Sequence, residues 1–102
     1  MQVVGKVSDN TLYIFLSGEL DEHSAPAARK MAGAAIDANA ACERAVFDLS
    51  GVRFMDSTGI GFLVGRYKRL RRYGIPAALQ SVDFAADKVL AMSGIYALIP
   101  KL

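Results

Sequence analysis

The sequence predicts one α/β domain, residues 1–102, in which a mixed β-sheet of about four to five strands carries helices packed on it. A chain of 102 residues has room for a single domain. Its composition, 53% hydrophobic and 22% charged, is that of a globular protein. Strand-like and helix-like segments follow in the order β-β-α-β-α-β-α, which is typical of a sheet with parallel crossover connections.

The chain opens with a predicted hairpin. Three valines in residues 3–7 suit a first strand, residues 11–17 suit a second, and Ser8-Asp9-Asn10 between them is typical of a turn. The second segment is apolar at every position from Leu12 to Leu16, a pattern that predicts a strand covered on both faces.

The first helix is predicted from Ser24, a favoured N-cap residue, to about Asn39, with Pro26 in its first turn. The expected inner face consists of Ala27, Met31, Ala35 and Ala38. A short apolar third strand, residues 45–49, follows, and residues 50–55 are expected to form a loop.

The second helix is predicted from Ser57 to Tyr73, because Gly74 is a typical C-cap glycine and Pro76 prevents continuation. Its apolar residues recur at helical spacing and predict a core face of Ile60, Leu63, Val64, Tyr67 and Leu70. A fourth strand (77–82), a third helix capped by Asp83 and closed by Gly94, and a short last strand (97–99) complete the prediction.

The net charge of +2 conceals a basic cluster in the second helix. Five basic side chains stand within seven residues without an acid, while the rest of the chain has seven basic and ten acidic residues. The cluster consists of Arg66, Lys68, Arg69, Arg71 and Arg72. Two interpretations stay open: a solvated helix face, or a contact with nucleic acid or an acidic partner.

Residues for catalysis are scarce. His23 has three acidic neighbours in residues 19–22, but this arrangement is also that of a polar loop before a helix. Cys42 is alone, and neither a P-loop nor a dinucleotide fingerprint is present. The longest stretch without a charge, residues 89–100, is too short to span a membrane. We therefore expect a cytoplasmic protein with no metal or cofactor.

The most informative segment is Asp56-Ser57-Thr58-Gly59, where a helix begins directly after a strand. The carboxyl ends of parallel strands are where such sheets bind ligands and partners. One polar residue is enough for a cap, and three in succession indicate a functional surface. A phosphate on Ser57 would face the positive end of the helix and add roughly −1.5 to −2 charge.

Two further features of this helix bear on a partner surface. On a helical wheel, Phe62 lies about 160° from the expected core face, which makes it a candidate interface anchor. Gly61 and Gly65 leave a strip of small residues that suits either a partner's backbone or close packing within the chain.

The segment Phe54-Met55-Asp56-Ser57-Thr58-Gly59-Ile60-Gly61, continued by Gly65-Arg66-Tyr67-Lys68, resembles the STAS-domain anti-sigma factor antagonists, and the continuation resembles their sporulation branch. Gly18-Glu19-Leu20-Asp21 and Met92-Ser93-Gly94 match at the corresponding places. The likeness covers nearly the whole chain and implies a STAS fold. Members of that family often continue into a final helix beyond the residues present here.

The resemblance implies a partner-switching function in a protein that is not itself an enzyme. The unphosphorylated protein would bind a serine kinase that is also an anti-sigma factor, and would thereby release a sporulation sigma factor. Phosphorylation of Ser57 would end the binding, and a PP2C-type phosphatase would restore it. The implied partner-binding residues are Asp21, Asp56, Ser57, Thr58, Gly59, Phe62 and Gly94.

Three alternatives remain open. The domain could serve another stress pathway or a transporter complex, or it could be a small nucleotide-binding α/β domain that uses the helix start at Ser57. Nucleic-acid binding would depend only on the basic cluster, which no aromatic platform or recognition motif accompanies. We therefore expect neither direct nucleic-acid binding nor membrane binding.

Overall fold

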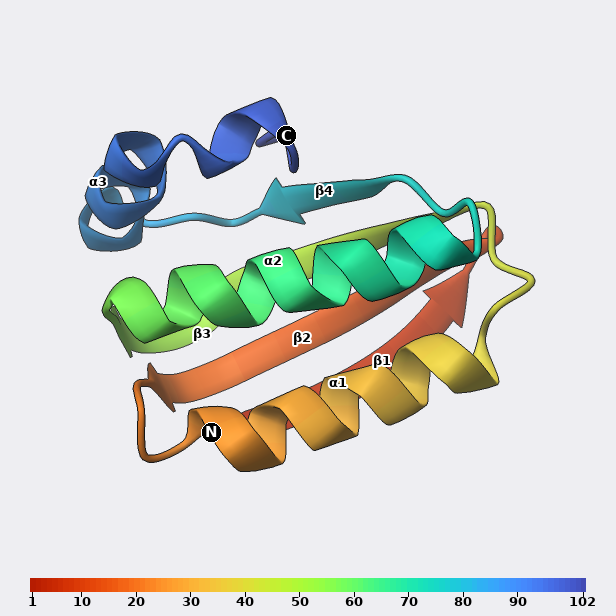
Figure 1. Cartoon of the computed structure of the whole chain (residues 1–102), viewed down its shortest axis with the longest axis horizontal. Coiled ribbons are helices and arrows are strands. Elements are labelled where there is room, and N and C mark those ends of the chain that lie inside the picture. Colours follow the sequence, from red (N-terminus) through yellow and green to blue (C-terminus); the bar gives the residue numbers. More distant parts are fainter.

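The computed structural model describes all residues 1–102 and contains the predicted mixed sheet, in the order β1-β2-β3-β4. β1 pairs antiparallel with β2, whereas β3 pairs parallel with β2 and β4 pairs parallel with β3. The strands are β1 (Gln2–Ser8), β2 (Thr11–Leu20), β3 (Arg44–Met55) and β4 (Ala77–Gln80), and the helices are α1 (Ala25–Ala38), α2 (Ser57–Arg72) and α3 (Phe84–Ser93). The predicted element order is confirmed (Figure 1).

The opening hairpin is also confirmed. Asp9 and Asn10 both take left-handed backbone conformations, with φ of 50° and 59°. A two-residue turn with positive φ at both positions matches the twist of the flanking strands. The turn sets the register in which Ser8 lies opposite Thr11.

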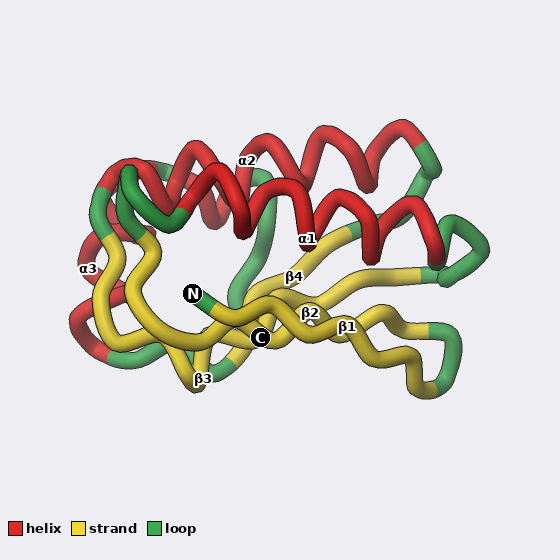
Figure 2. Tube along the Cα trace, turned by 90° about the horizontal axis from the view of Figure 1, so that it is seen from below, coloured by secondary structure: helices red, strands yellow, loops and turns green.

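α1 and α2 cover one face of the sheet, and the prediction that the second strand is covered on both faces is wrong. α1 and α2 lie on the same side of the sheet (Figure 2). In β2, Leu12, Ile14 and Leu16 are buried, whereas Tyr13 and Phe15 are only partly covered and their rings stack on each other at a centroid distance of 6.1 Å. Tyr13 and Phe15 stack on each other on the face that the helices leave open. Because both side chains are aromatic, the sequence of β2 lacks the alternation of apolar and polar residues that marks a strand with one open face.

The predicted inner face of α1 is wrong as well. The residues that are buried are Ala25, Ala28, Ala32, Gly33 and Ile36, while Met31 is exposed. Alanines occur on every side of this helix and give its apolar pattern no clear direction. The single large aliphatic residue that enters the core, Ile36, fixes the orientation that the structure shows.

β3 is longer than predicted, because the expected loop at residues 50–55 continues the strand. It remains paired with β2 through two register shifts, one between Phe15 and Ser17 and one between Gly18 and Glu19. Gly51 permits the close approach of β3 to β2, since a Cβ atom at this position would lie 2.6 Å from the Cβ of Ser17. The bulged strand ends with Met55 directly beside Leu20.

In α2, Leu63 and Leu70 are buried as predicted, and Ile60, Val64 and Tyr67 are half-buried. Phe62 is 0% exposed, so its assignment to the outer surface is wrong. α2 is buried not only against the sheet but also along the side that faces α1. A helical wheel with a single buried arc does not anticipate a second neighbour of this kind.

The C-terminal part follows the prediction less closely. Asp83 caps α3 by accepting a hydrogen bond from the Ala86 N–H at 2.8 Å, and Gly94 ends it in the left-handed region, both as predicted. β4 stops at Gln80, however, and residues Ile95–Ala97 form a 3₁₀ turn (η1) in place of the expected last strand. The additional sheet pairing comes from Lys101, which bridges to Leu79.

We predict that Phe62→Ala lowers the free energy of unfolding by about 3 to 5 kcal/mol, because it leaves a cavity in the hydrophobic core. Phe84, which is 76% exposed, is the matched control, and Phe84→Ala should change stability by no more than about 0.5 kcal/mol. Denaturant unfolding measures both. Equal effects of the two substitutions would contradict the burial of Phe62.

Candidate functional site

The candidate site is the edge of the sheet at which β2 and β3 end together. Leu20 pairs with Met55 in the last position of these parallel strands. Asp21 and Asp56 are the next residues of the two strands, and they lead into α1 and α2 respectively. Both helices start at this edge (Figure 1). The structure therefore brings together two acidic segments that lie 35 positions apart in the sequence.

Asp21 holds the turn that leads into α1. Its Oδ1 atom accepts hydrogen bonds from the N–H groups of Ser24, at 2.9 Å, and His23, at 3.0 Å. In return, the Ser24 hydroxyl accepts a hydrogen bond from the Asp21 N–H and donates one to the carbonyl of Glu19. The hydrogen bond from the Ser24 N–H keeps the pKa of Asp21 below its ordinary value, so this carboxylate is ionised at neutral pH. Ser24 is the N-cap residue of α1, as predicted, but its hydroxyl contacts Asp21 and Glu19 and makes no cap hydrogen bond to the helix.

Asp56 has the corresponding role at the start of α2. Its Oδ1 atom accepts a hydrogen bond from the Thr58 N–H at 2.9 Å, and its carbonyl accepts one from the Gly59 N–H. Asp56 is therefore the N-cap, and the exposed Ser57 hydroxyl makes no hydrogen bond within the chain. The hydroxyl is accessible at the first helical position and is not needed to hold the helix.

Gly59 has a packing role and is not part of an accessible surface. It is buried, and a Cβ atom there would lie 2.5 Å from Met55 Cγ and 3.3 Å from Leu20 Cδ2. The absence of a side chain lets the first turn of α2 rest on the ends of β2 and β3. The prediction that Gly59 contacts a partner is corrected accordingly.

Gly61 and Gly65 differ from Gly59, because a Cβ atom at either position would have no atom within 4 Å. The structure thus excludes close packing of this glycine strip within the chain. Ser57, Gly61 and Gly65 follow one another at intervals of four residues, so they lie along one side of α2. The strip leaves room for another backbone next to the serine.

The other predicted site residues fall into two groups. Thr58 is half-buried beside Asp56, while Phe62 belongs to the core and cannot anchor an interface. Gly94 is exposed at the end of α3, with φ of 78°, and no hydrogen bond joins it to the segment 56–58. Its partner contact stays a prediction.

The basic cluster of α2 does not form one surface. Arg69 forms an ion pair with Asp37 of α1, and the Arg71 Nη1 atom donates a hydrogen bond to the Tyr67 hydroxyl at 3.1 Å. Arg66 is partly buried, whereas Lys68 and Arg72 are exposed. The side chains of the basic cluster therefore point in different directions around the helix.

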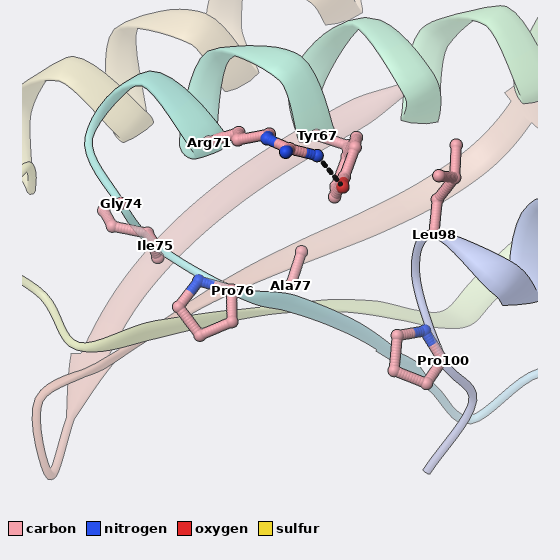
Figure 3. Close-up of a pocket in the computed structure, with 8 residues that line it drawn as sticks. All are labelled: Tyr67, Arg71, Gly74, Ile75, Pro76, Ala77, Leu98 and Pro100. Carbon is pink, nitrogen blue, oxygen red and sulfur yellow. Dashed lines mark hydrogen bonds between the residues drawn. The ribbon is translucent and has the colours of Figure 1, made fainter.

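The hollow drawn in Figure 3, of about 380 Å³, lies away from this edge of the sheet. Tyr67 and Arg71 of α2 line it, together with Ile75, Leu98 and Pro100. Ser57 and Arg71 are 14 residues apart on one helix, which corresponds to about 21 Å. The hollow is therefore separate from the Ser57 segment.

No group of three or more His, Cys, Asp or Glu side chains is placed to hold a metal ion. His23 contributes only its backbone N–H to the contacts of Asp21. None of the helices has the length and apolar content needed to cross a bilayer.

Comparison with known proteins identifies the type of domain. The STAS domain family matches residues 2–102. An anti-sigma F factor antagonist of Paenibacillus polymyxa is 37% identical over 89 residues, which cover 87% of this chain and 75% of the relative. An anti-sigma-B factor antagonist of Bacillus subtilis (strain 168) is 27% identical over 90 residues, which cover 88% of this chain and 80% of the relative.

Solved structures show the same fold. The anti-sigma factor antagonist SpoIIAA in its unphosphorylated form superposes with a TM-score of 0.79 at 25% identity, over 99% of this chain and 88% of that one. The phosphorylated form of Bacillus SpoIIAA gives a TM-score of 0.70 at 26% identity, over 99% of this chain and 91% of that one. The mixed sheet with its three helices matches the fold of these structures.

We predict opposite effects for two alanine substitutions in the first turns of α2. Gly61→Ala should raise the free energy of unfolding by about 0.5 to 1 kcal/mol, because alanine favours the helix and the new methyl group has open space. Gly59→Ala should lower it by about 1 to 3 kcal/mol, because the methyl group overlaps the Met55 side chain. Chemical denaturation measures both, and a stabilising Gly59→Ala would refute the packing role of Gly59.

Proposed function

The chain belongs to the STAS domain family, and we propose that it is an anti-sigma factor antagonist of the sporulation type, controlled by phosphorylation of Ser57. Unphosphorylated, it binds an anti-sigma factor that is also a serine kinase, and this binding releases a sigma factor. The observation that carries the proposal is the exposed Ser57 hydroxyl, which is free of hydrogen bonds while Asp56 caps the helix.

The phosphorylation step requires little from this chain. The Ser57 oxygen bonds to the γ-phosphorus of ATP, ADP leaves, and the hydroxyl proton is lost to the kinase or to water. The kinase supplies ATP and the catalytic groups, and this chain supplies only an acceptor that a kinase can reach. We accordingly propose that the protein is a substrate and not an enzyme, that it acts in the cytoplasm, and that a PP2C-type phosphatase reverses the step.

The structure favours a switch that blocks the surface without refolding the domain. The sequence suggested that the positive end of α2 would receive the phosphate, but Asp56 already accepts the Thr58 N–H there. The phosphate would thus join two carboxylates, Asp21 and Asp56, that are both fixed by hydrogen bonds at the same edge of the sheet. An interface formed with a neutral hydroxyl would then face about two additional negative charges.

The similarity to an anti-sigma-B factor antagonist keeps a related role in a stress pathway as the second candidate. Both roles use the same Ser57 switch and differ in the kinase, so binding to the two kinds of anti-sigma factor separates them. A nucleotide-binding function is disfavoured, because the Asp56 carboxylate occupies the start of α2 where a nucleotide phosphate would bind. Nucleic-acid binding is disfavoured by the division of the basic cluster between different contacts.

We predict that Ser57→Ala keeps the stability of the domain within about 0.5 kcal/mol, binds the kinase and takes no phosphate. The measurement is incubation with the anti-sigma kinase and ATP, followed by mass-spectrometric mapping of the product. Phosphate on Thr58 or Ser50 of the wild-type protein would contradict the assignment. Phosphorylated wild-type protein should bind the kinase at least about 100-fold more weakly, since like charges at an interface can cost several kcal/mol.

Amide spectra of the free protein separate a surface block from refolding. Phosphorylation should shift signals near residues 21–24 and 56–61 and leave those of the sheet and α3 in place. Shifts that extend through the whole sheet would show that the phosphate acts by rearranging the domain.

We predict that two substitutions of Asp21 separate its charge from its structural role. Asp21→Ala should lower the free energy of unfolding by about 0.5 to 2 kcal/mol, because the Ser24 and His23 N–H groups lose their acceptor. Asp21→Asn retains an acceptor oxygen and should cost little. Both variants should weaken binding to the kinase if the carboxylate faces a basic group. Unchanged affinity of Asp21→Asn would limit Asp21 to holding the turn before α1.

A further inference from the structure

The hollow drawn in Figure 3 lies between three separate parts of the chain: the last turns of α2, the start of β4 and residues 98–100. Backbone hydrogen bonds fix these parts relative to one another. At the end of α2, the Ile75 N–H donates to the Leu70 carbonyl at 3.0 Å. In β4, the Leu79 N–H donates to the Pro100 carbonyl at 2.8 Å. The hollow, of about 380 Å³, is therefore open to a ligand without any rearrangement of the domain.

Apolar side chains form most of the lining of the hollow. Ile75 and Ala77 are buried, whereas Leu98, a large aliphatic residue, is 45% exposed. Pro76 and Pro100 complete this apolar lining. A ligand that covers Leu98 and the two prolines removes apolar surface from water, which favours binding. The lining thus suits a ligand with an apolar body.

The side chains of Tyr67 and Arg71, one turn apart on α2, add polar groups to the hollow. The Arg71 Nη1 atom donates a hydrogen bond to the Tyr67 hydroxyl at 3.1 Å, drawn as the dashed line in Figure 3. A guanidinium group has several N–H donors, so Arg71 retains free donors, and the tyrosine hydroxyl still has its own hydrogen to donate. Arg71 forms no ion pair within the chain, and no acidic residue lines the hollow. The polar end of the hollow therefore suits an anionic group.

We propose that this hollow binds a small organic acid with an apolar body, of the aromatic or branched aliphatic carboxylate class. The carboxylate accepts hydrogen bonds from Arg71 and from the Tyr67 hydroxyl, and the apolar body covers Leu98. One guanidinium compensates the single charge of a carboxylate, whereas a phosphate group of roughly −1.5 to −2 charge would remain partly uncompensated. The volume lies toward the lower end of the range for ligand pockets, which favours a small molecule.

The first experiment titrates the full chain with phenylacetate and, separately, with 4-methylpentanoate, and follows the amide spectrum. Acetate, which lacks the apolar body, and phenylacetamide, which lacks the charge, are the controls at equal ionic strength. We expect saturable shifts near residues 67–77 and 98–100 with at least one of the two acids, and at least tenfold weaker binding of both controls. The proposal is overturned if neither acid saturates by about 10 mM, or if phenylacetamide binds as well as phenylacetate.

Two matched pairs of variants locate the ligand. Arg71→Met keeps the apolar stem and should weaken binding of the acid at least tenfold, whereas Arg72→Met, at an exposed arginine outside the hollow, should leave the dissociation constant within twofold. Leu98→Ser should weaken binding at least threefold, and Met92→Ser, at a residue that is 90% exposed and outside the hollow, should not.

Thermal unfolding without ligand verifies that each variant is folded. Equal affinities within both pairs would place the acid elsewhere and refute the site. Shifts of residues 67–77 that follow the protein concentration and not the acid would show that a second copy of the chain occupies the hollow, which also contradicts the proposal.

Discussion

The parallel pairing of β2 with β3 is the constraint on which the rest of the molecule depends. It places Leu20 beside Met55, so that both strands end at the same edge and both following helices start there. The two register shifts and Gly51 are the local means by which the twelve-residue strand β3 stays alongside β2 to its last residue. Without this pairing, Asp21 and Asp56 would be unrelated loop residues.

At this edge the same arrangement occurs after both strands. Each strand is followed by an aspartate whose carboxylate accepts backbone N–H groups, in the turn before α1 for Asp21 and in the first turn of α2 for Asp56. Because Asp56 provides the cap of α2, the neighbouring hydroxyl of Ser57 is left for chemistry. A modification can therefore change the charge of the surface while the helix keeps its cap, which is the property that a switch acting by surface block needs.

The packing of α1 and α2 on the same face of the sheet has a different consequence. Two helices must share one face, so they contact each other as well as the sheet. Phe62 of α2 is completely buried, and the Nε and Nη1 atoms of Arg66, one turn farther along, are buried without a hydrogen-bond partner. The packing of α2 thus leaves polar atoms of one arginine unpaired.

The amino-acid sequence alone was enough to predict the element order, the hairpin turn at Asp9-Asn10, the caps of α3 and the accessible position of Ser57. These features depend on local signals, such as turn residues, cap residues and glycine at helix ends, which act within a few positions. The packing of the whole domain was needed to show which side of α1 is buried, that Phe62 is a core residue, and that Gly59 and Gly61 have different surroundings. Those outcomes depend on which neighbour a helix meets, and no local pattern contains that information.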